Sequence, residues 1–178
     1  ENVISDADYK FLKTKLKIDG YDEWYFIVWF MAATGARVSE LLHIKAEHVQ
    51  VGYLDLYSKG GKIRRLYIPK TLRIEATKWI KEKELSSGYI FLNRFGQRIT
   101  TRGIAQQLKH FAEKYGLKRD VVYPHSFRHR FAKNFLDRFN DLALLADLMG
   151  HESIETTRIY LRRTASEQQK IVDKVVNW

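Results

Sequence analysis

The feature that most constrains this fold is an uninterrupted apolar stretch of ten residues from Trp24 to Ala33. It carries no charge, yet it is too short to span the hydrocarbon core of a bilayer, which needs about 20 residues. A helix that is apolar on all sides has to be enclosed by other elements. We therefore predict a buried helix over residues 21–34, which Gly35 ends.

The rest of the sequence predicts further helices and one β-hairpin. Residues 53–57 alternate apolar and polar side chains, residues 63–68 form a second strand closed by Pro69, and residues 58–61 have turn chemistry. Helices are predicted near residues 6–16, 38–42, 71–85, 100–116, 125–138, 141–150, 153–160 and 165–178, with a short strand at 89–92. The predicted N-caps are Asp6 or Asp8, Thr100 or Thr101, Asp141 and Ser153. We expect a mainly α fold with a small antiparallel β-sheet, in the α+β class.

The charge of the chain favours a polyanionic partner. Lysine and arginine number 31 against 21 aspartates and glutamates, which gives a formal net charge of +10. Residues 53–73 hold six basic residues and one acidic, and residues 94–133 hold ten basic and two acidic. These charges lie among core residues, which is typical of a folded surface that follows phosphates. Cysteine is absent, which excludes disulfides, thiolate metal sites and a cysteine nucleophile.

Six polar residues lie at predicted element boundaries or turns, where a side chain can reach a ligand from a rigid scaffold. They are Arg37, Lys59, His125, Arg128, His151 and Tyr160. His125 and Arg128 share one face of a helix start, and a helix N-terminus favours a bound anion. Two guanidiniums can clamp the oxygens of one phosphate in forked geometry. The six residues therefore predict a site for phosphoryl transfer.

Four motifs follow one another in a definite order between about residues 21 and 163. They are Ala33–Leu41, Ser58–Lys62, Pro124–His129, and Leu148–His151 with Tyr160 nine residues further on. Each motif alone is a weak signal, but four in order with the hairpin between them are a strong one. In this order they resemble the tyrosine recombinase (phage integrase) family. The resemblance implies a catalytic-domain fold of the tyrosine recombinase and type IB topoisomerase kind.

The resemblance also implies how DNA is cut. Tyr160 is the nucleophile that attacks the scissile phosphate and releases a 5′-hydroxyl. Lys59 is the general acid for the leaving oxygen, and Lys62 is the rival for that role. Tyrosine has a pKa of about 10, so nearby positive donors are needed to help it lose its proton.

The same resemblance assigns the remaining site residues. Arg37 and Arg128 hold the phosphate, His125 assists proton transfer, and His151 donates to a phosphate oxygen. No metal or cofactor is expected, because the arginines supply the positive charge that a metal ion supplies elsewhere. Lys62, Arg64, Arg98 and Arg102 are predicted to contact DNA, because they lie in the basic segments.

Each residue also has a plainer interpretation. Arg37 can simply pair with Glu40, and Lys59 can be a solvated turn residue. His125 and His129 are four apart on a helix, which can indicate zinc, but the metalloprotease glutamate does not follow. His151 can be a polar helix cap and Tyr160 a packing residue. Only the joint occurrence of all six residues in order favours catalysis.

The sequence leaves two alternative functions open, and it also predicts the partners. An inactive DNA-binding module and a type IB topoisomerase are the alternatives to a site-specific recombinase of a mobile element. The expected partners are double-stranded DNA and further copies of the chain, as a tetramer on two duplexes. No membrane role is expected, and the predicted setting is a prokaryotic cytoplasm.

Domain organisation follows from the same resemblance. We expect residues 1–178 to form a single catalytic domain, and we expect the N-terminal core-binding domain of the family to be absent from this chain. The apolar stripe of the C-terminal segment, residues 165–178, either packs on its own domain or docks on a neighbouring protomer.

Overall fold

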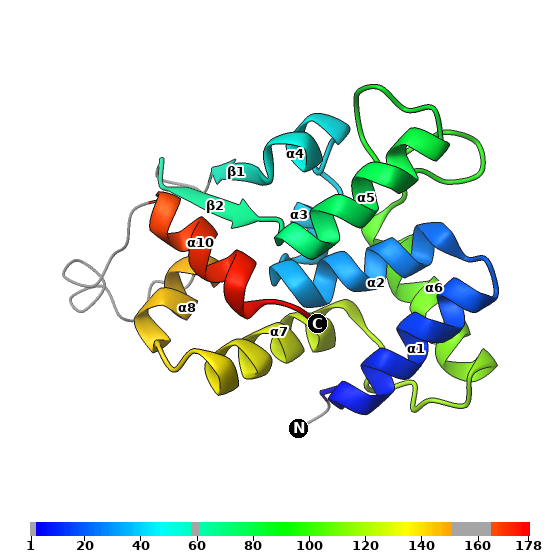
Figure 1. The fold of residues 1–178 in the computed structure, drawn as a ribbon. Coiled ribbons are helices and arrows are strands. Elements are labelled where there is room, and N and C mark those ends of the chain that lie inside the picture. The colour runs from blue at the N-terminus through cyan, green and yellow to red at the C-terminus, as the bar shows by residue number, and fades with distance from the viewer. Residues whose placement is uncertain (1–2, 58–60, 151–164) are drawn as a thin grey trace.

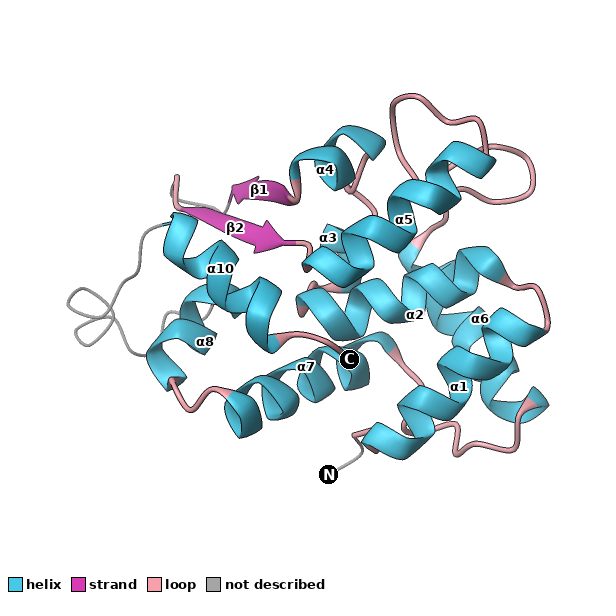
Figure 2. Cartoon of the chain, in the orientation of Figure 1, coloured by secondary structure: helices cyan, strands magenta, loops and turns pink. Residues whose placement is uncertain are grey.

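The computed structural model describes residues 3–57, 61–150 and 165–178, and helices make up most of them (Figure 1, Figure 2). In chain order the elements are α1 (Asp6–Ile18), α2 (Asp22–Thr34), α3 (Val38–Leu41), α4 (Ala46–Val51), β1 (Tyr53–Tyr57), β2 (Ile63–Tyr67), α5 (Lys70–Glu82), α6 (Thr101–Lys114), α7 (Pro124–Arg138), α8 (Leu142–Met149) and α10 (Ala165–Val175). The predicted class, mainly α with a small antiparallel sheet, is confirmed.

Helix α2 forms the centre of this fold, as the apolar stretch predicts. Every residue from Phe26 to Thr34 is buried, and α1, α5 and α7 pack around the helix (Figure 1). The ring of Phe26 stacks on Trp79 of α5, with the ring centroids 4.5 Å apart. Gly35 ends α2 in the left-handed conformation at φ 71°, as predicted. Among the described residues, no helix combines the length and the apolar character that crossing a bilayer requires.

Among the described residues, the helix N-caps follow the predicted chemistry with one exception; the predicted cap Ser153 and its helix over residues 153–160 lie outside them. Thr100 and Asp141 each accept a backbone N–H bond at the start of α6 and α8, as predicted. At α1 the predicted cap, Asp6 or Asp8, is wrong. Ser5 is the cap, and its hydroxyl accepts the N–H of Asp8 at 3.0 Å. The two aspartates lie instead in the first turn, where their charge favours the positive end of the helix dipole.

The predicted hairpin is present. Strands β1 and β2 are antiparallel, with Tyr53 opposite Tyr67 and Tyr57 opposite Ile63. The predicted turn residues 58–60 lie outside the described residues. The hairpin is followed by α5, whose N-cap is Pro69.

Two parts of the secondary structure differ from the prediction. Residues 89–92 do not form a strand: Tyr89 makes one isolated bridge to Lys45, and Leu92 makes one to Arg98. A strand needs a continuous partner, which this segment does not find. Helix α4 was not predicted, because its six residues carry too short an apolar pattern for helical periodicity to show.

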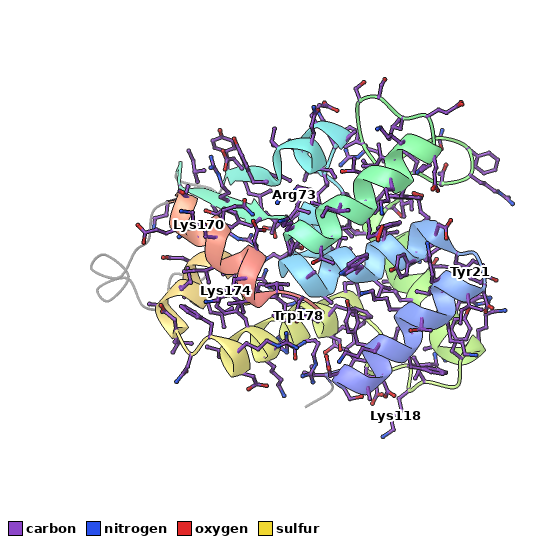
Figure 3. The ribbon with its side chains drawn as sticks, in the orientation of Figure 1. Tyr21, Arg73, Lys118, Lys170, Lys174 and Trp178 are labelled. Carbon is purple, nitrogen blue, oxygen red and sulfur yellow. The ribbon has the colours of Figure 1, made fainter. Side chains whose placement is uncertain are left out.

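The C-terminal segment packs on its own chain. The indole N–H of Trp178 donates to the carbonyl of Ala32 at 2.8 Å, and that of Trp29 donates to the Trp178 carbonyl at 3.0 Å. Figure 3 shows Trp178 at the C-terminus, after the end of α10 and beside α2 and α7. Nearer the start of α10, the hydroxyl of Tyr67 donates to the side chain of Gln168 at 2.6 Å. Of the two predicted placements the structure shows this one, and exchange between protomers stays a prediction.

Candidate active site

Arg37 is held at the entry of α3 directly after the end of α2. The hydroxyl of Thr34 donates to the carbonyl of Phe30 at 2.6 Å and accepts the N–H of Ala36 at 3.2 Å, which fixes the turn. Glu40 then accepts the backbone N–H of Arg37 at 2.8 Å and pairs with its guanidinium at 3.1 Å. The predicted plainer interpretation, an Arg37–Glu40 pair, therefore exists. The Arg37 side chain nevertheless keeps 45% of its surface exposed, so it can still reach a ligand.

Arg64 reaches the same carboxylate from strand β2. Its guanidinium lies 2.6 Å from Glu40 and also donates to the carbonyl of Leu148, at the end of α8, at 2.9 Å. The Arg64 side chain is only 11% exposed, although Arg64 was predicted as a DNA contact. Burial lowers the pKa of Arg64, and the Glu40 charge opposes that effect. For Glu40, burial acts to raise the pKa, but the Arg64 charge and the Arg37 N–H leave it below its ordinary value.

Arg128 lies deep beside these groups, in the first turns of α7. It is 2% exposed, and its guanidinium donates to the carbonyl of Gly35 at 2.5 Å and to that of Met149 at 2.7 Å. Burial, together with the positive charges of Arg37 and Arg64, lowers its pKa to about 10. Arg128 therefore stays charged at neutral pH, and it joins the C-terminal ends of α2 and α8.

His125 lies on the same helix start and is exposed. Its ring meets that of His129 edge-to-face with the centroids 4.5 Å apart. Burial lowers the pKa of His125, as do the neighbouring His129, Arg128 and Arg37. The charges of both predicted phosphate-binding arginines therefore act on this imidazole. Among the described residues, no three His, Asp or Glu side chains are grouped as metal ligands.

The structure thus brings three of the six predicted site residues together: Arg37, His125 and Arg128. The other three, Lys59, His151 and Tyr160, lie outside the described residues. Their segments adjoin the cluster in sequence, because β2 carries Arg64 and α8 ends at Met149, two residues before His151.

The sequence prediction gave Glu40 no role in the site and did not predict that Arg64 pairs with Glu40 in a largely enclosed position. Glu40 was considered only as a partner that would neutralise Arg37, whereas it is shared between two arginines. A signal for Arg64 was available: it lies two residues before Leu66, so both share one face of β2, and Leu66 is buried. Strand alternation therefore places Arg64 on the inner face.

The other predicted DNA contacts lie on the surface. Lys62 is exposed just before β2, and Arg102 is exposed in the first turn of α6. Arg98 is exposed but anchored, because its guanidinium donates to the Leu42 carbonyl at 2.7 Å and covers the ring of Tyr89 at 3.9 Å. These three side chains keep solvent-facing charge, unlike Arg64 and Arg128.

Comparison with known proteins identifies the family of this chain. The sequence profile described as the Phage integrase family matches residues 9–167. The chain belongs to the phage integrase family. Among curated relatives in this family, tyrosine recombinase XerA of Pyrococcus furiosus is 34% identical over 154 residues, which cover 83% of this chain and 53% of the relative. Tyrosine recombinase XerD of Listeria innocua is 34% identical over 141 residues, covering 74% of this chain and 47% of the relative.

Two solved recombinase structures share the fold. A crystal structure of XerA recombinase matches with a TM-score of 0.73 and 25% identity, over 97% of this chain and 64% of that one. XerH site-specific recombinase bound to difH substrate matches with a TM-score of 0.69 and 23% identity, over 94% of this chain and 52% of that one. The present chain spans about half the length of the curated relatives it matches.

Proposed function

We propose that this chain is the catalytic domain of a site-specific recombinase that cleaves and rejoins double-stranded DNA. The observation that carries the proposal is the cluster of Arg37, His125 and Arg128, which come from two distant segments of a phage integrase family chain. Phosphoryl transfer is served by such a cluster, because negative charge builds up on the phosphate oxygens in the transition state.

The proposed reaction proceeds through a covalent tyrosine. The Tyr160 oxygen forms a bond to the scissile phosphorus, and the bond from phosphorus to the 5′-oxygen breaks. Lys59 gives the departing 5′-oxygen its proton, while Arg37 and Arg128 stabilise the charge on the non-bridging oxygens. The 3′-phosphotyrosine retains the energy of the broken bond, so a 5′-hydroxyl can reverse the step without ATP.

Two histidines complete the proposed chemistry. The pKa of His125 lies below its ordinary value, so its ring is mostly neutral at neutral pH and can accept a proton. His151 is proposed to donate to a phosphate oxygen. Neither role requires a metal ion, because the arginine cluster carries the positive charge.

The proposed partners are duplex DNA and further copies of this chain. Lys62, Arg98 and Arg102 carry positive charge on exposed side chains, and we assign them to the DNA backbone. A related fold, that of XerH, was solved bound to difH substrate. We propose a tetramer on two duplexes; a mass measurement of the protein–DNA complex tests it, and one copy per duplex contradicts it.

The proposed setting is a mobile element in a prokaryotic cytoplasm. The relatives named above come from Pyrococcus furiosus and Listeria innocua. Recombined sites at both ends of a DNA segment that carries this coding sequence support a mobile element. A single chromosomal site used by the enzyme argues instead for a resolvase.

The deciding experiment traps the covalent intermediate. The protein is incubated with nicked duplexes of randomised sequence, and protein–DNA adducts that survive denaturation are isolated and sequenced. The unaltered protein is expected to give adducts, and Tyr160→Phe is expected to give none. Tyr21→Phe is the matched control, because it also removes only a hydroxyl. The Tyr21 ring packs on Phe111 with the ring centroids 5.0 Å apart, and the substitution keeps that ring.

The outcomes separate the alternatives. Adducts that form equally with Tyr160→Phe contradict the proposed nucleophile. DNA binding without any adduct favours an inactive DNA-binding module. Relaxation of supercoiled plasmid by a monomer with no preferred site favours a type IB topoisomerase.

A further inference from the structure

Arg64 occupies a junction between three parts of the chain. Arg64 belongs to strand β2. Its guanidinium contacts Glu40 of α3 at 2.6 Å and donates to the carbonyl of Leu148, in the last turn of α8, at 2.9 Å. Its side chain is 11% exposed, and its Nη2 atom is buried. A guanidinium in this position has little surface to offer to DNA.

The first consequence of this junction concerns Arg37. Glu40 has one carboxylate for two guanidiniums, and the contact to Arg64, at 2.6 Å, is shorter than the contact to Arg37, at 3.1 Å. Arg64 therefore takes the larger share of the Glu40 charge. Arg37, 45% exposed, keeps more of its positive charge available for a phosphate.

The second consequence concerns the end of α8. The last carbonyls of a helix lack partners within the helix, and here the partly buried Arg64 and the buried Arg128 donate to them. Arg64 donates to Leu148, and Arg128 donates to Met149 at 2.7 Å. A Cβ atom added to Gly150 would lie 2.6 Å from Cδ of Arg64, so the chain at Gly150 passes directly over the Arg64 side chain. His151 is the next residue in the sequence.

We propose that Arg64 is a positioning residue, which keeps Glu40 from neutralising Arg37 and joins strand β2 to the end of α8. This inference rests on the proposed cleavage of DNA. Arg64 acts through Arg37 and through the α8 terminus, and it does not contact the DNA itself. The substitutions that test it therefore change the rate of cleavage more than the affinity for DNA.

The test compares two neighbouring arginines of β2. Arg65 also pairs with a carboxylate, that of Asp55, through bonds of 2.8 and 3.0 Å, but it lies on the other face of the strand. Arg64→Gln and Arg65→Gln therefore remove the same charge from adjacent positions. For each protein, fluorescence anisotropy gives the Kd for DNA, and denaturing gels give the rate of adduct formation at saturating DNA. The substrate is one duplex recovered from the randomised pool with the unaltered protein.

Arg64→Gln is expected to slow adduct formation about tenfold to a hundredfold, because displacements of about 1 Å at a reacting centre have effects of that size. The Kd of Arg64→Gln is expected to stay within about threefold of the Kd of the unaltered protein. The cleavage rate of Arg65→Gln is expected to stay within about threefold of the unaltered rate. If Arg64→Gln does not fold, Arg64→Lys is measured. It keeps the charge but cannot span Glu40 and Leu148 with one planar fork, and a rate about tenfold lower is expected.

A rescue experiment distinguishes positioning from a general loss of structure. In Arg64→Gln the Glu40 carboxylate has only Arg37 as a partner. Adding Glu40→Gln removes that charge, so the double variant is expected to cleave faster than Arg64→Gln alone. A double variant that is equally slow or slower overturns the inference.

Four further outcomes are informative. A Kd that rises at least tenfold with an unchanged rate makes Arg64 a DNA contact and overturns the inference. Equal losses of rate in Arg64→Gln and Arg65→Gln also overturn it. Absence of any adduct with the unaltered protein overturns the proposed function, whereas a normal rate with Arg64→Gln overturns the positioning role alone.

Discussion

The basic residues of this chain fall into an inner and an outer region that use positive charge differently. The inner region is Arg64, which is partly buried, and Arg128, which is buried; both donate to helix-end carbonyls, and Arg64 also pairs with Glu40. The outer region is Arg98 and Arg102, which are exposed. A buried cation is tolerated only when fixed acceptors replace its lost water. Inner arginines therefore hold segments together, and outer arginines remain available for a partner.

The largest expected effect comes from removing the buried Arg128. Arg128→Ala deprives the carbonyls of Gly35 and Met149 of a donor. A buried polar group without a partner costs about 1–3 kcal/mol, so a loss of about 2–5 kcal/mol in the free energy of unfolding is expected. Urea denaturation measures it. Arg102→Ala is the outer control, and an equal loss there would abolish the distinction between the two regions.

A second prediction concerns the glycine that accepts from Arg128. Gly35 has φ 71°, and an added Cβ atom would lie 2.7 Å from Cδ2 of Phe131. Gly20 has φ 78°, but nothing lies within 4 Å of its added Cβ. Gly35→Ala is expected to destabilise by about 2–4 kcal/mol and Gly20→Ala by about 1 kcal/mol. Thermal or urea unfolding checks this, and equal effects would mean that Phe131 moves aside freely.

A third prediction concerns His125, which is exposed like the outer arginines and whose pKa is lowered in part by the buried Arg128. Its ring is exposed, yet burial and the charges of His129, Arg128 and Arg37 lower its pKa. If a neutral ring accepts the proton, the rate of adduct formation is constant near neutral pH and falls only below about pH 6.5, the ordinary value, by up to about tenfold per unit. A pH–rate profile measures it. His125→Gln should remove this acidic limb, whereas His110→Gln, exposed on α6, should keep it; a limb that persists in His125→Gln assigns it to another group.

The smallest expected effect belongs to the outer region. Arg102→Gln is expected to change the free energy of unfolding by less than about 0.5 kcal/mol. It should weaken DNA binding a few-fold for any sequence, and it should reduce the slope of log Kd against log salt by about 1. Binding isotherms at several salt concentrations check this. An unchanged slope would remove Arg102 from the DNA-contacting surface.

The local sequence was sufficient for most elements. The ten apolar residues before Thr34 require an enclosed helix, Gly35 provides its left-handed end, and Asp141 caps α8. These signals act within a few residues of one another, so no tertiary information is needed. The predicted strand at 89–92 failed because a strand exists only through a partner elsewhere in the chain.

The candidate site could be predicted from the sequence only in part. The motif order predicts which residues take part, and the structure brings Arg37, His125 and Arg128 together; Lys59, His151 and Tyr160 stay predictions. What the sequence by itself determined is most of the described helices, the hairpin and the family. Which arginine is buried and which carboxylate it shares was decided by the tertiary structure, because desolvation and long-range hydrogen bonds depend on packing that neighbouring residues do not encode.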